Sequence, residues 1–238
     1  MKKDILKNIS ILIGAAIIGL SILGGFYLNN KMGNSGKNDF VDPDSFFSGR
    51  EFKKEEFLIG SGSKKVILLE YSDLECPFCK KLHIDTMQEI YKNYGSKVDI
   101  AFRHFPLPFH KKAKTEATAT LCARDIGGQQ AYKNYIGKIY EKTQGNDSLD
   151  LNTLPDIAKE IGLNVTSFNS CMSNASSSET KLALIESDIQ DGISAGVEGT
   201  PNVFVLIKDG QDYKKFTIIN GARDYKYVSK VIDQALKQ

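Results

Sequence analysis

Tryptophan is absent from this 238-residue chain, and cysteine and methionine occur only four times each. The chain also lacks an excess of charge of one sign, because 31 Lys and Arg stand against 29 Asp and Glu, for a formal net charge of +2. Nucleic-acid-binding domains usually carry a marked basic excess, so this balance argues against nucleic acid as a partner. Internal repeats and low-complexity tracts are absent too, and the length suits one domain with additional segments.

A long apolar run near the N-terminus stands out from this balanced composition. Ile9–Leu28 is almost wholly apolar, and about 20 such residues span a bilayer core. Cleavable signals have a shorter apolar region and a small-x-small site, whereas here no Ala-x-Ala and no cysteine for lipid attachment is present. We therefore expect residues 1–31 to be an uncleaved signal-anchor with a transmembrane helix. Because Lys2, Lys3 and Lys7 precede the apolar run, the N-terminus is expected in the cytoplasm and the rest of the chain outside it.

The remaining chain divides into a polar linker, residues 32–50, and a globular domain, residues 51–238. Within the linker, Phe46 and Phe47 are the residues that could pack on the domain. Alternating and helical patterns predict the order β, α, β, a block of helices, β, β, α. The expected strands are 57–59, 66–69, 97–102, 202–207 and 216–219; the expected helices are 78–94, 111–126, 131–143, 154–161, one that Thr166 caps, 179–195 and 225–236.

The stretch Glu70-Tyr71-Ser72-Asp73-Leu74-Glu75-Cys76-Pro77-Phe78-Cys79 carries the expected chemistry. It follows a buried strand and leads into a helix, which places Cys76 at the helix start and Cys79 one turn inside. Pro77 suits the first helical position because its missing N–H would have no partner there. A Cys-x-x-Cys motif at such a junction indicates redox chemistry rather than metal binding.

The placement predicts how the two thiols differ. Unpaired N–H groups and the helix dipole stabilise an anion at a helix start, so the pKa of Cys76 is expected well below the roughly 8.5 of a free thiol. Cys79 should be less exposed, and Glu70 is the nearest candidate to exchange a proton with it. The apolar neighbours of Glu70 favour its partial burial.

Four cysteines in an oxidising compartment suggest disulfides. Cys76 and Cys79 form the obvious pair, and the even count lets Cys122 pair with Cys171. The other two pairings would consume the dithiol at the strand–helix junction, so we disfavour them.

This order of elements resembles the thioredoxin fold, and the helical block, about residues 108–196, resembles the insertion of its DsbA-type branch. Three stretches carry the resemblance besides Cys-Pro-Phe-Cys: Glu70-Tyr71-Ser72-Asp73, Phe102-Arg103-His104-Phe105-Pro106-Leu107 and Ala195-Gly196-Val197-Glu198-Gly199-Thr200-Pro201. It covers about residues 57–236 and is closest to membrane-tethered, single-domain bacterial members. The expected fold class is therefore α/β, a thioredoxin fold with an inserted helical domain.

The resemblance implies a role for each matching position. Cys76 would be the nucleophile, Cys79 the resolving cysteine and Glu70 the buried acid. Thr200-Pro201 would form a loop with a cis peptide bond that faces the dithiol, and it would bind substrate together with Pro77 and Phe78. Cys122 and Cys171 would form the structural disulfide that some members carry in the helical block.

Two features depart from the branch. Relatives often have a tryptophan near the dithiol, and the strongest oxidants have Pro-His where this chain has Pro77-Phe78. A histidine there would help to stabilise the Cys76 thiolate, so its absence bears on oxidising strength.

The expected function is a thiol–disulfide oxidoreductase without a cofactor, which oxidises reduced or unfolded proteins and is itself reoxidised by a quinone-linked membrane partner. One alternative keeps the fold but works as a reductase or isomerase. Another is a metal-binding module in which Cys76, Cys79 and His83 supply ligands. Outside these candidates, His104 and His110 are expected to be structural or solvated, and Arg103 to pair with a carboxylate.

Overall fold

The computed structural model describes residues 47–238. The expected signal-anchor, residues 1–31, and most of the expected linker, including Phe46, lie outside the described residues. Within residues 47–238, none of the helices combines the length and the apolar character needed to cross a membrane.

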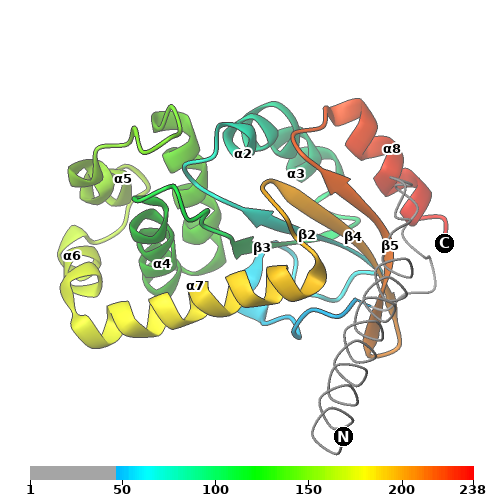
Figure 1. Ribbon diagram of the computed structural model, residues 1–238, viewed down its shortest axis with the longest axis horizontal. Helices are drawn as coiled ribbons and strands as arrows, with labels where there is room; N and C mark the ends of the chain where they lie inside the picture. Colours follow the sequence, from blue (N-terminus) through cyan, green and yellow to red (C-terminus); the bar gives the residue numbers. More distant parts are fainter. Residues whose placement is uncertain (1–46) are drawn as a thin grey trace, which may run out of the picture. The chain divides into compact units, whose positions relative to one another are not determined.

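A five-stranded mixed sheet organises the described chain (Figure 1). Its order is β1-β3-β2-β4-β5, and β2 lies at its centre. β2 and β3 run parallel, as expected for a βαβ unit, while the other neighbouring pairs are antiparallel. The strands are β1 (Phe57–Ile59), β2 (Val66–Ser72), β3 (Asp99–His104), β4 (Asn202–Asp209) and β5 (Asp212–Asn220).

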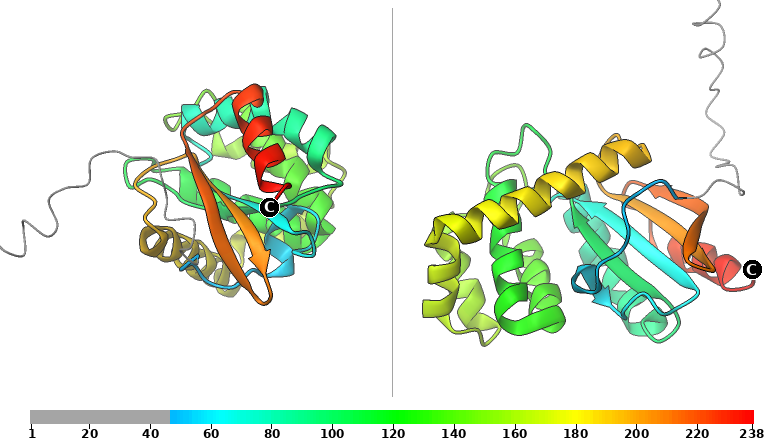
Figure 2. Two further views of the ribbon diagram at one scale, coloured as in Figure 1. Left: turned by 90° about the vertical axis from the view of Figure 1, so that its right-hand side faces the viewer. Right: turned by 90° about the horizontal axis from the view of Figure 1, so that it is seen from below.

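Helices cover both faces of the sheet and form a separate group at one end (Figures 1 and 2). One face packs under α2 (Pro77–Leu82), α3 (Gln88–Tyr94) and α8 (Tyr225–Ala235), and the other packs under the C-terminal part of α7 (Ala175–Ala195). The end group contains α4 (Ala113–Lys142), α5 (Leu154–Glu160) and α6 (Val165–Ser173). Short turns of helix occur at Lys54–Glu56, His83–Met87 and Leu151–Thr153.

The central strand β2 is buried along its whole length, so both of its faces meet protein. Ile67, Leu69 and Tyr71 pack on the α7 side, whereas Val66 and Leu68 pack on the α3 and α8 side. Because side chains alternate along a strand, the next two positions on the Val66 face are polar ones near the dithiol. The strand therefore carries polar groups into the interior at its carboxyl end.

The inserted helices build a core that is continuous with the dithiol. The five residues expected at the centre of the insertion are all buried, which confirms the pattern: Tyr132, Tyr135, Ile136, Ile139 and Tyr140. Cys76 and Cys79 belong to the same apolar cluster. A disulfide joins Cys122 of α4 to Cys171 of α6, so the insertion is cross-linked as well as packed.

Several boundaries differ from those expected. The helix expected over 78–94 is interrupted by a wider π turn, His83–Met87, and β3 begins two residues later than expected. The expected stop between the helices of 111–126 and 131–143 is present as a break at Gly128, whose φ of 69° is not helical. Helix α6 is capped by Asn164 rather than by Thr166, because the Asn164 side chain accepts the Ser167 N–H at 2.8 Å.

Helix α7 corrects the expected inward face. Leu182 and Ile193, both expected to face inward, are 44% and 56% exposed. Ile185 is buried as expected, but Asp188 and Asp191 take inward positions further along the helix. Their charges are compensated by arginines from other elements, which apolar periodicity does not reveal.

A buried network of charges attaches residues 47–56 to the domain. Arg103 of β3 donates to Glu56 at 3.0 Å and also to Asp191, which confirms the expected carboxylate pairing. Arg50 pairs with Glu56 and Asp188. Phe47 packs on the sheet, with its N–H bonded to the Tyr213 carbonyl at 2.8 Å. The folded unit therefore begins before residue 51, within the segment expected to be linker.

We predict that Arg103→Leu lowers the free energy of unfolding by about 3–5 kcal/mol, because Asp191 would remain buried without its cation and Glu56 would keep only Arg50. Urea denaturation of both proteins measures the difference. Lys81→Ala is the control, since it removes only an exposed pair with Asp85 and should cost less than about 1 kcal/mol. Equal, small losses in the two variants would contradict a buried network.

Candidate active site

The dithiol lies where β2 ends and α2 begins, as the sequence predicted. Cys76 is the N-cap of α2, Pro77 takes the first helical position, and Cys79 lies one turn inside. Both cysteines are free thiols, and Cys76 keeps 5% of its surface exposed whereas Cys79 keeps none. A client sulfur can therefore approach Cys76 but not Cys79.

The two thiols have opposite acidities. The pKa of Cys76 is lowered to about 6, first because the Cys79 thiol donates a hydrogen bond to its sulfur, and further because the N–H groups of Cys79 and Phe78 donate to it, against the opposing effect of burial. Burial raises the pKa of Cys79 well above its ordinary value, and the hydrogen bond to Cys76 adds to this. At neutral pH the pair therefore consists of one thiolate and one thiol.

The loop before β4 faces this pair. The Thr200–Pro201 peptide bond is cis, and the Cys76 sulfur lies 3.5 Å from the Thr200 carbonyl oxygen. A shallow groove beside the loop is lined by Phe78, Lys81, Thr200, Asn220, Gly221, Ala222 and Arg223. Phe78 is 64% exposed there. Pro77 is exposed but does not line this groove; its ring lies against the Gly145 backbone.

Glu70 lies fully inside the protein, beyond the partial burial that the sequence predicted. It is flanked in the sheet by Phe102 and Val203, and neither carboxyl oxygen has a hydrogen-bond partner of ordinary length in residues 47–238. Burial raises its pKa to about 7, while the Ser72 hydroxyl acts in the opposite direction. A carboxyl with this pKa can hold or release a proton near neutral pH.

Residues 53–234 match a family model described as thioredoxin. The chain belongs to the thioredoxin family. With the helical insertion and the Cys-x-x-Cys pair at the start of α2, it is a DsbA-like thiol–disulfide oxidoreductase of that superfamily.

Individual relatives agree with this thioredoxin-family assignment. Disulfide bond formation protein D of Bacillus subtilis (strain 168) is 22% identical over 80% of this chain and 81% of that protein. Among solved structures, alpha-DsbA1 of Wolbachia pipientis has a TM-score of 0.65 at 24% identity, covering 79% of this chain and 93% of its own. Oxidised BdbD of Bacillus subtilis has a TM-score of 0.64 at 20% identity, covering 82% and 100%. Mycobacterial proteins named Na(+)/H(+) antiporter NhaA 1 also match, but the chain spans only about a quarter of their length.

Asp73 connects the thioredoxin-family dithiol to the loop after β3. One carboxylate oxygen accepts the Glu75 N–H at 2.7 Å, and the other accepts the Leu107 N–H at 2.7 Å and lies 2.8 Å from Nδ1 of His110. His110 and His104 are both buried, which confirms a structural rather than a solvated position. Sequence patterns alone do not single out Asp73, because nothing in its spacing links it to residues more than 30 positions later.

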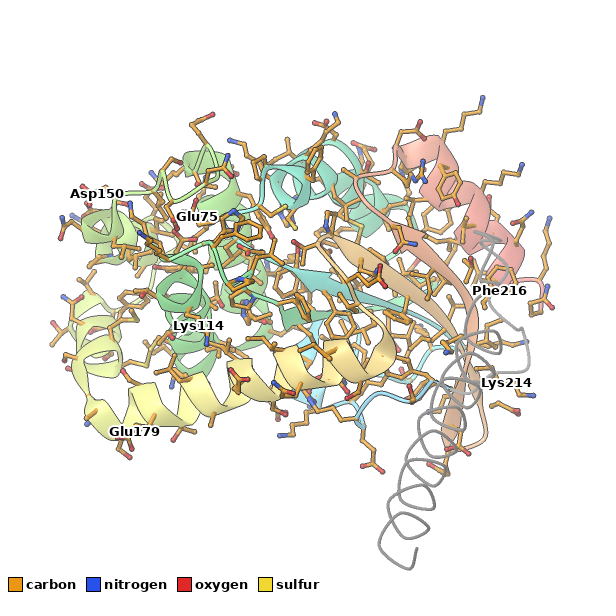
Figure 3. The ribbon with its side chains drawn as sticks, viewed as in Figure 1. Glu75, Lys114, Asp150, Glu179, Lys214 and Phe216 are labelled. Atoms are coloured by element: carbon orange, nitrogen blue, oxygen red, sulfur yellow. A yellow bond between two sulfur atoms is a disulfide. The ribbon has the colours of Figure 1, made fainter. Side chains whose placement is uncertain are left out.

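Two further acids, Glu75 and Glu116, are buried in this part of the protein. Glu75 lies in the loop between β2 and α2 (Figure 3), and Glu116 of α4 interacts with it. The pKa of Glu116 is raised to about 10, chiefly by burial and also by its interaction with Glu75. Glu116 is therefore neutral at pH 7, so the two acids do not carry two charges near Cys76.

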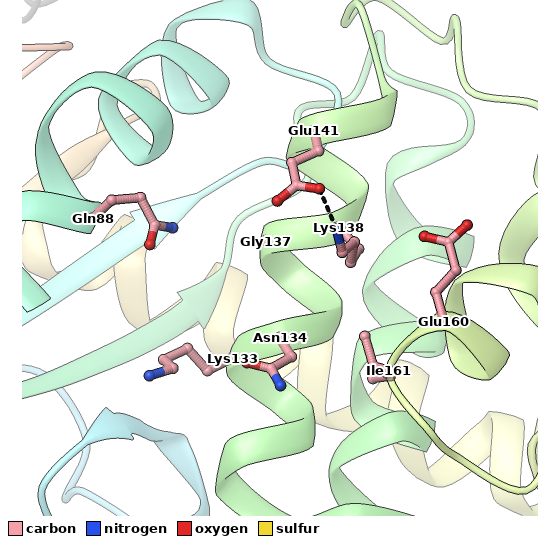
Figure 4. Close-up of a pocket in the computed structure, with 8 residues that line it drawn as sticks. All are labelled: Gln88, Lys133, Asn134, Gly137, Lys138, Glu141, Glu160 and Ile161. Carbon is pink, nitrogen blue, oxygen red and sulfur yellow. Dashed lines mark hydrogen bonds and ion pairs between the residues drawn. The ribbon is translucent and has the colours of Figure 1, made fainter.

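His83 does not join the sulfurs. Its Nε2 lies 2.7 Å from the Gln88 amide nitrogen, and Gln88 borders a surface hollow along α4 that contains neither cysteine (Figure 4). Burial lowers the pKa of His83 to about 4. Residues 47–238 contain no group of three or more His, Cys, Asp or Glu that could hold a metal, so the arrangement does not support the metal-module alternative.

We predict that reduced protein is alkylated by iodoacetamide with half-maximal rate at about pH 6, because only the Cys76 thiolate, present above that pH, reacts. Cys79→Ala should move the midpoint upward, since it removes the strongest hydrogen bond to the thiolate. Cys76→Ser should react negligibly between pH 5 and pH 8. A wild-type midpoint near that of a free thiol would refute the assigned acidities.

Proposed function

We propose that this oxidoreductase works as a dithiol oxidase that introduces disulfides into secreted or envelope proteins. The observation that carries the proposal is the low pKa of Cys76, about 6, beside a cysteine whose pKa is raised. A stabilised thiolate stabilises the reduced enzyme and so makes its disulfide a stronger oxidant. The names of Disulfide bond formation protein D and of the DsbA structures support the same direction.

The reaction is an exchange of sulfur–sulfur bonds. A substrate thiolate attacks the Cys76 sulfur of the Cys76–Cys79 disulfide, and Cys79 leaves with the electron pair. A second substrate thiolate then attacks the substrate sulfur of the mixed disulfide and releases Cys76 as a thiolate. The substrate loses two electrons and gains a disulfide, and the enzyme leaves as a dithiol.

Client proteins would bind beside the cis-proline loop. Thr200 and Pro201 offer backbone groups next to Cys76, and an extended client strand can pair with such groups with little demand on its sequence. Exposed Phe78 adds an apolar contact in the adjoining groove. Pro77 would contribute through its exposed ring at the same helix start.

The enzyme would act on the outer side of the membrane, in the periplasm or at the cell surface, held there by residues 1–31 as an uncleaved anchor. A membrane protein linked to quinones would reoxidise the Cys76/Cys79 pair by the same exchange. Such a cycle needs no cofactor bound to this chain, and the near-neutral charge gives no reason to expect nucleic acid as a partner.

A reductase or isomerase with the same site is the second candidate. The observation that favours it is the Pro77-Phe78 dipeptide, which lacks the histidine of strongly oxidising relatives. Both candidates use the same atoms, so the direction depends on the redox potential of the pair.

We predict that purified protein in its disulfide form oxidises a reduced, unfolded protein substrate, and that Cys76→Ser abolishes this reaction because no sulfur remains for the client to attack. Free-thiol titration and refolding of the substrate measure it. Ser177→Ala is a suitable control, since Ser177 contacts Lys181 and Cys171 in the insertion and not the dithiol. Oxidation by the Cys76→Ser protein would disprove the assignment of the nucleophile.

We also predict that the redox potential of the Cys76/Cys79 pair is more positive than the roughly −270 mV of thioredoxin. The reason is again the stabilised thiolate. Equilibration with glutathione buffers, followed by separation of the reduced and oxidised forms, gives the value. A potential at or below that of thioredoxin would favour the reductase.

A further inference from the structure

The proposed reaction leaves one proton unaccounted for. When a client thiolate attacks Cys76, the leaving Cys79 sulfur becomes an anion in a fully buried position, where its pKa is raised well above the ordinary value. It must take a proton, and solvent cannot supply one directly to a residue with no exposed surface. Glu70 can store a proton at neutral pH, which raises the question of what joins the two groups.

Ser72 is placed between them. It follows Glu70 by two positions on β2, so both side chains leave the same face of the strand. Glu70, Ser72 and Cys79 are all without exposed surface. The Ser72 hydroxyl lowers the pKa of both the Cys79 thiol and the Glu70 carboxyl, so it lies near both groups, although neither pair is at ordinary hydrogen-bond distance.

Tyr140 fixes the orientation of this serine. Its hydroxyl lies 3.0 Å from Oγ of Ser72 and 3.3 Å from the Asp73 carbonyl oxygen. The N–H of Asp73 in turn donates to the Cys79 sulfur at 3.4 Å. Tyr140 comes from α4, so the helical insertion supplies the hydroxyl that holds the serine near both reacting groups.

Resting on the proposed function, we propose that the Ser72 hydroxyl relays the proton between Glu70 and Cys79, and that Tyr140 is the positioning residue of this relay. A hydroxyl suits the task because it accepts one proton while it donates another. Ser72 neither gains nor loses charge overall, which matters in an interior where an added charge is costly.

The step balances within the site. As the Cys76–Cys79 bond breaks and the client–Cys76 bond forms, the Ser72 proton passes to the Cys79 sulfur and the Glu70 proton passes to the Ser72 oxygen. Glu70 is left as a carboxylate and Cys79 as a thiol. When the dithiol is reoxidised, Cys79 attacks the mixed disulfide at Cys76 and its proton returns to Glu70 by the reverse path. One proton therefore shuttles through the whole cycle.

Other titratable groups near the relay do not compete with it at neutral pH. Tyr91 of α3 and Tyr140 have pKa values raised well above the ordinary tyrosine value, chiefly by burial, and the pKa of His83 lies at about 4, so all three stay neutral. Cys76 cannot exchange a proton in the step that is measured below, because its sulfur is bonded in the mixed disulfide. Asp73 has its carboxylate bonded to Leu107 and His110.

The test follows the attack of Cys79 on a mixed disulfide between Cys76 and 5-thio-2-nitrobenzoate, whose release is recorded by stopped-flow absorbance. In the wild type the rate should rise with pH through about 7, because Glu70 accepts the proton only as a carboxylate. Ser72→Ala should slow release at pH 7 by about 100-fold, the size typical of a lost proton-transfer group, and should remove the inflection. Ser72→Thr, which keeps the hydroxyl, should retain both.

Matched variants separate relay from packing. Tyr140→Phe should slow release. The control is Tyr135→Phe, which removes an equally buried hydroxyl of α4 that donates to the Leu154 carbonyl, 2.8 Å away; it should leave the rate of release unchanged. Glu70→Gln combined with Ser72→Ala should be no slower than the slower single variant, because both interrupt one path. If Ser72→Ala does not fold, Tyr140→Phe decides, and an unchanged rate and pH profile there overturns the relay.

The same assay separates this inference from the proposed function. A wild type whose Cys76 forms no mixed disulfide, or whose Cys79 does not resolve one, would refute the enzyme assignment itself. A wild type that resolves it normally, with Ser72→Ala matching it in rate and pH dependence, would refute the relay alone. Effects of Glu70→Gln and Ser72→Ala that multiply would also refute it.

Discussion

The properties of this site depend on the burial of its ionisable groups against the central strand of the sheet. β2 is covered on both faces, so a carboxyl on it loses its water and receives no ordinary donor in exchange. Such a group responds by shifting its pKa rather than by remaining charged. Glu70 thereby becomes a proton store near neutral pH, and the same burial keeps Cys79 protonated. Of the two thiols of the dithiol, the site then favours the anion at Cys76, which keeps 5% of its surface exposed.

The helical insertion takes part in this arrangement. Its core contains the dithiol, and α4 contributes Tyr140 to the polar contacts around Ser72. The Cys122–Cys171 disulfide closes a loop with a sequence separation of 49, which the chain-entropy account values at roughly 4 kcal/mol. The insertion therefore supports the chemistry at the end of the sheet as well as adding surface.

Periodic patterns and the Cys-x-x-Cys motif predicted the order of elements and the dithiol, and the resemblance to the DsbA-type branch implied the thioredoxin fold, the loop at Thr200-Pro201 and the buried acid Glu70. A carboxylate partner was expected for Arg103, but not which one, and the pairing of Asp73 with His110 was not predicted. These contacts join polar residues from distant parts of the chain, and hydrophobic periodicity carries no signal for a buried polar partner. The same reason explains α7, where Leu182 and Ile193 fit an apolar pattern but two aspartates take the inward positions.

Without a histidine between the two cysteines, the Cys76 thiolate is still stabilised, but by other groups. A histidine would act through a charge that it loses as the pH rises past its own pKa. Here the donors to Cys76 are the Cys79 thiol and backbone N–H groups of α2. Cys79 does not titrate near neutral pH, since burial raises its pKa, and amide groups do not titrate at all. These donors to the Cys76 anion therefore do not titrate across the neutral range, whereas His110, whose pKa is raised in part by Cys76, does. Phe78 is left free to present an apolar face to clients.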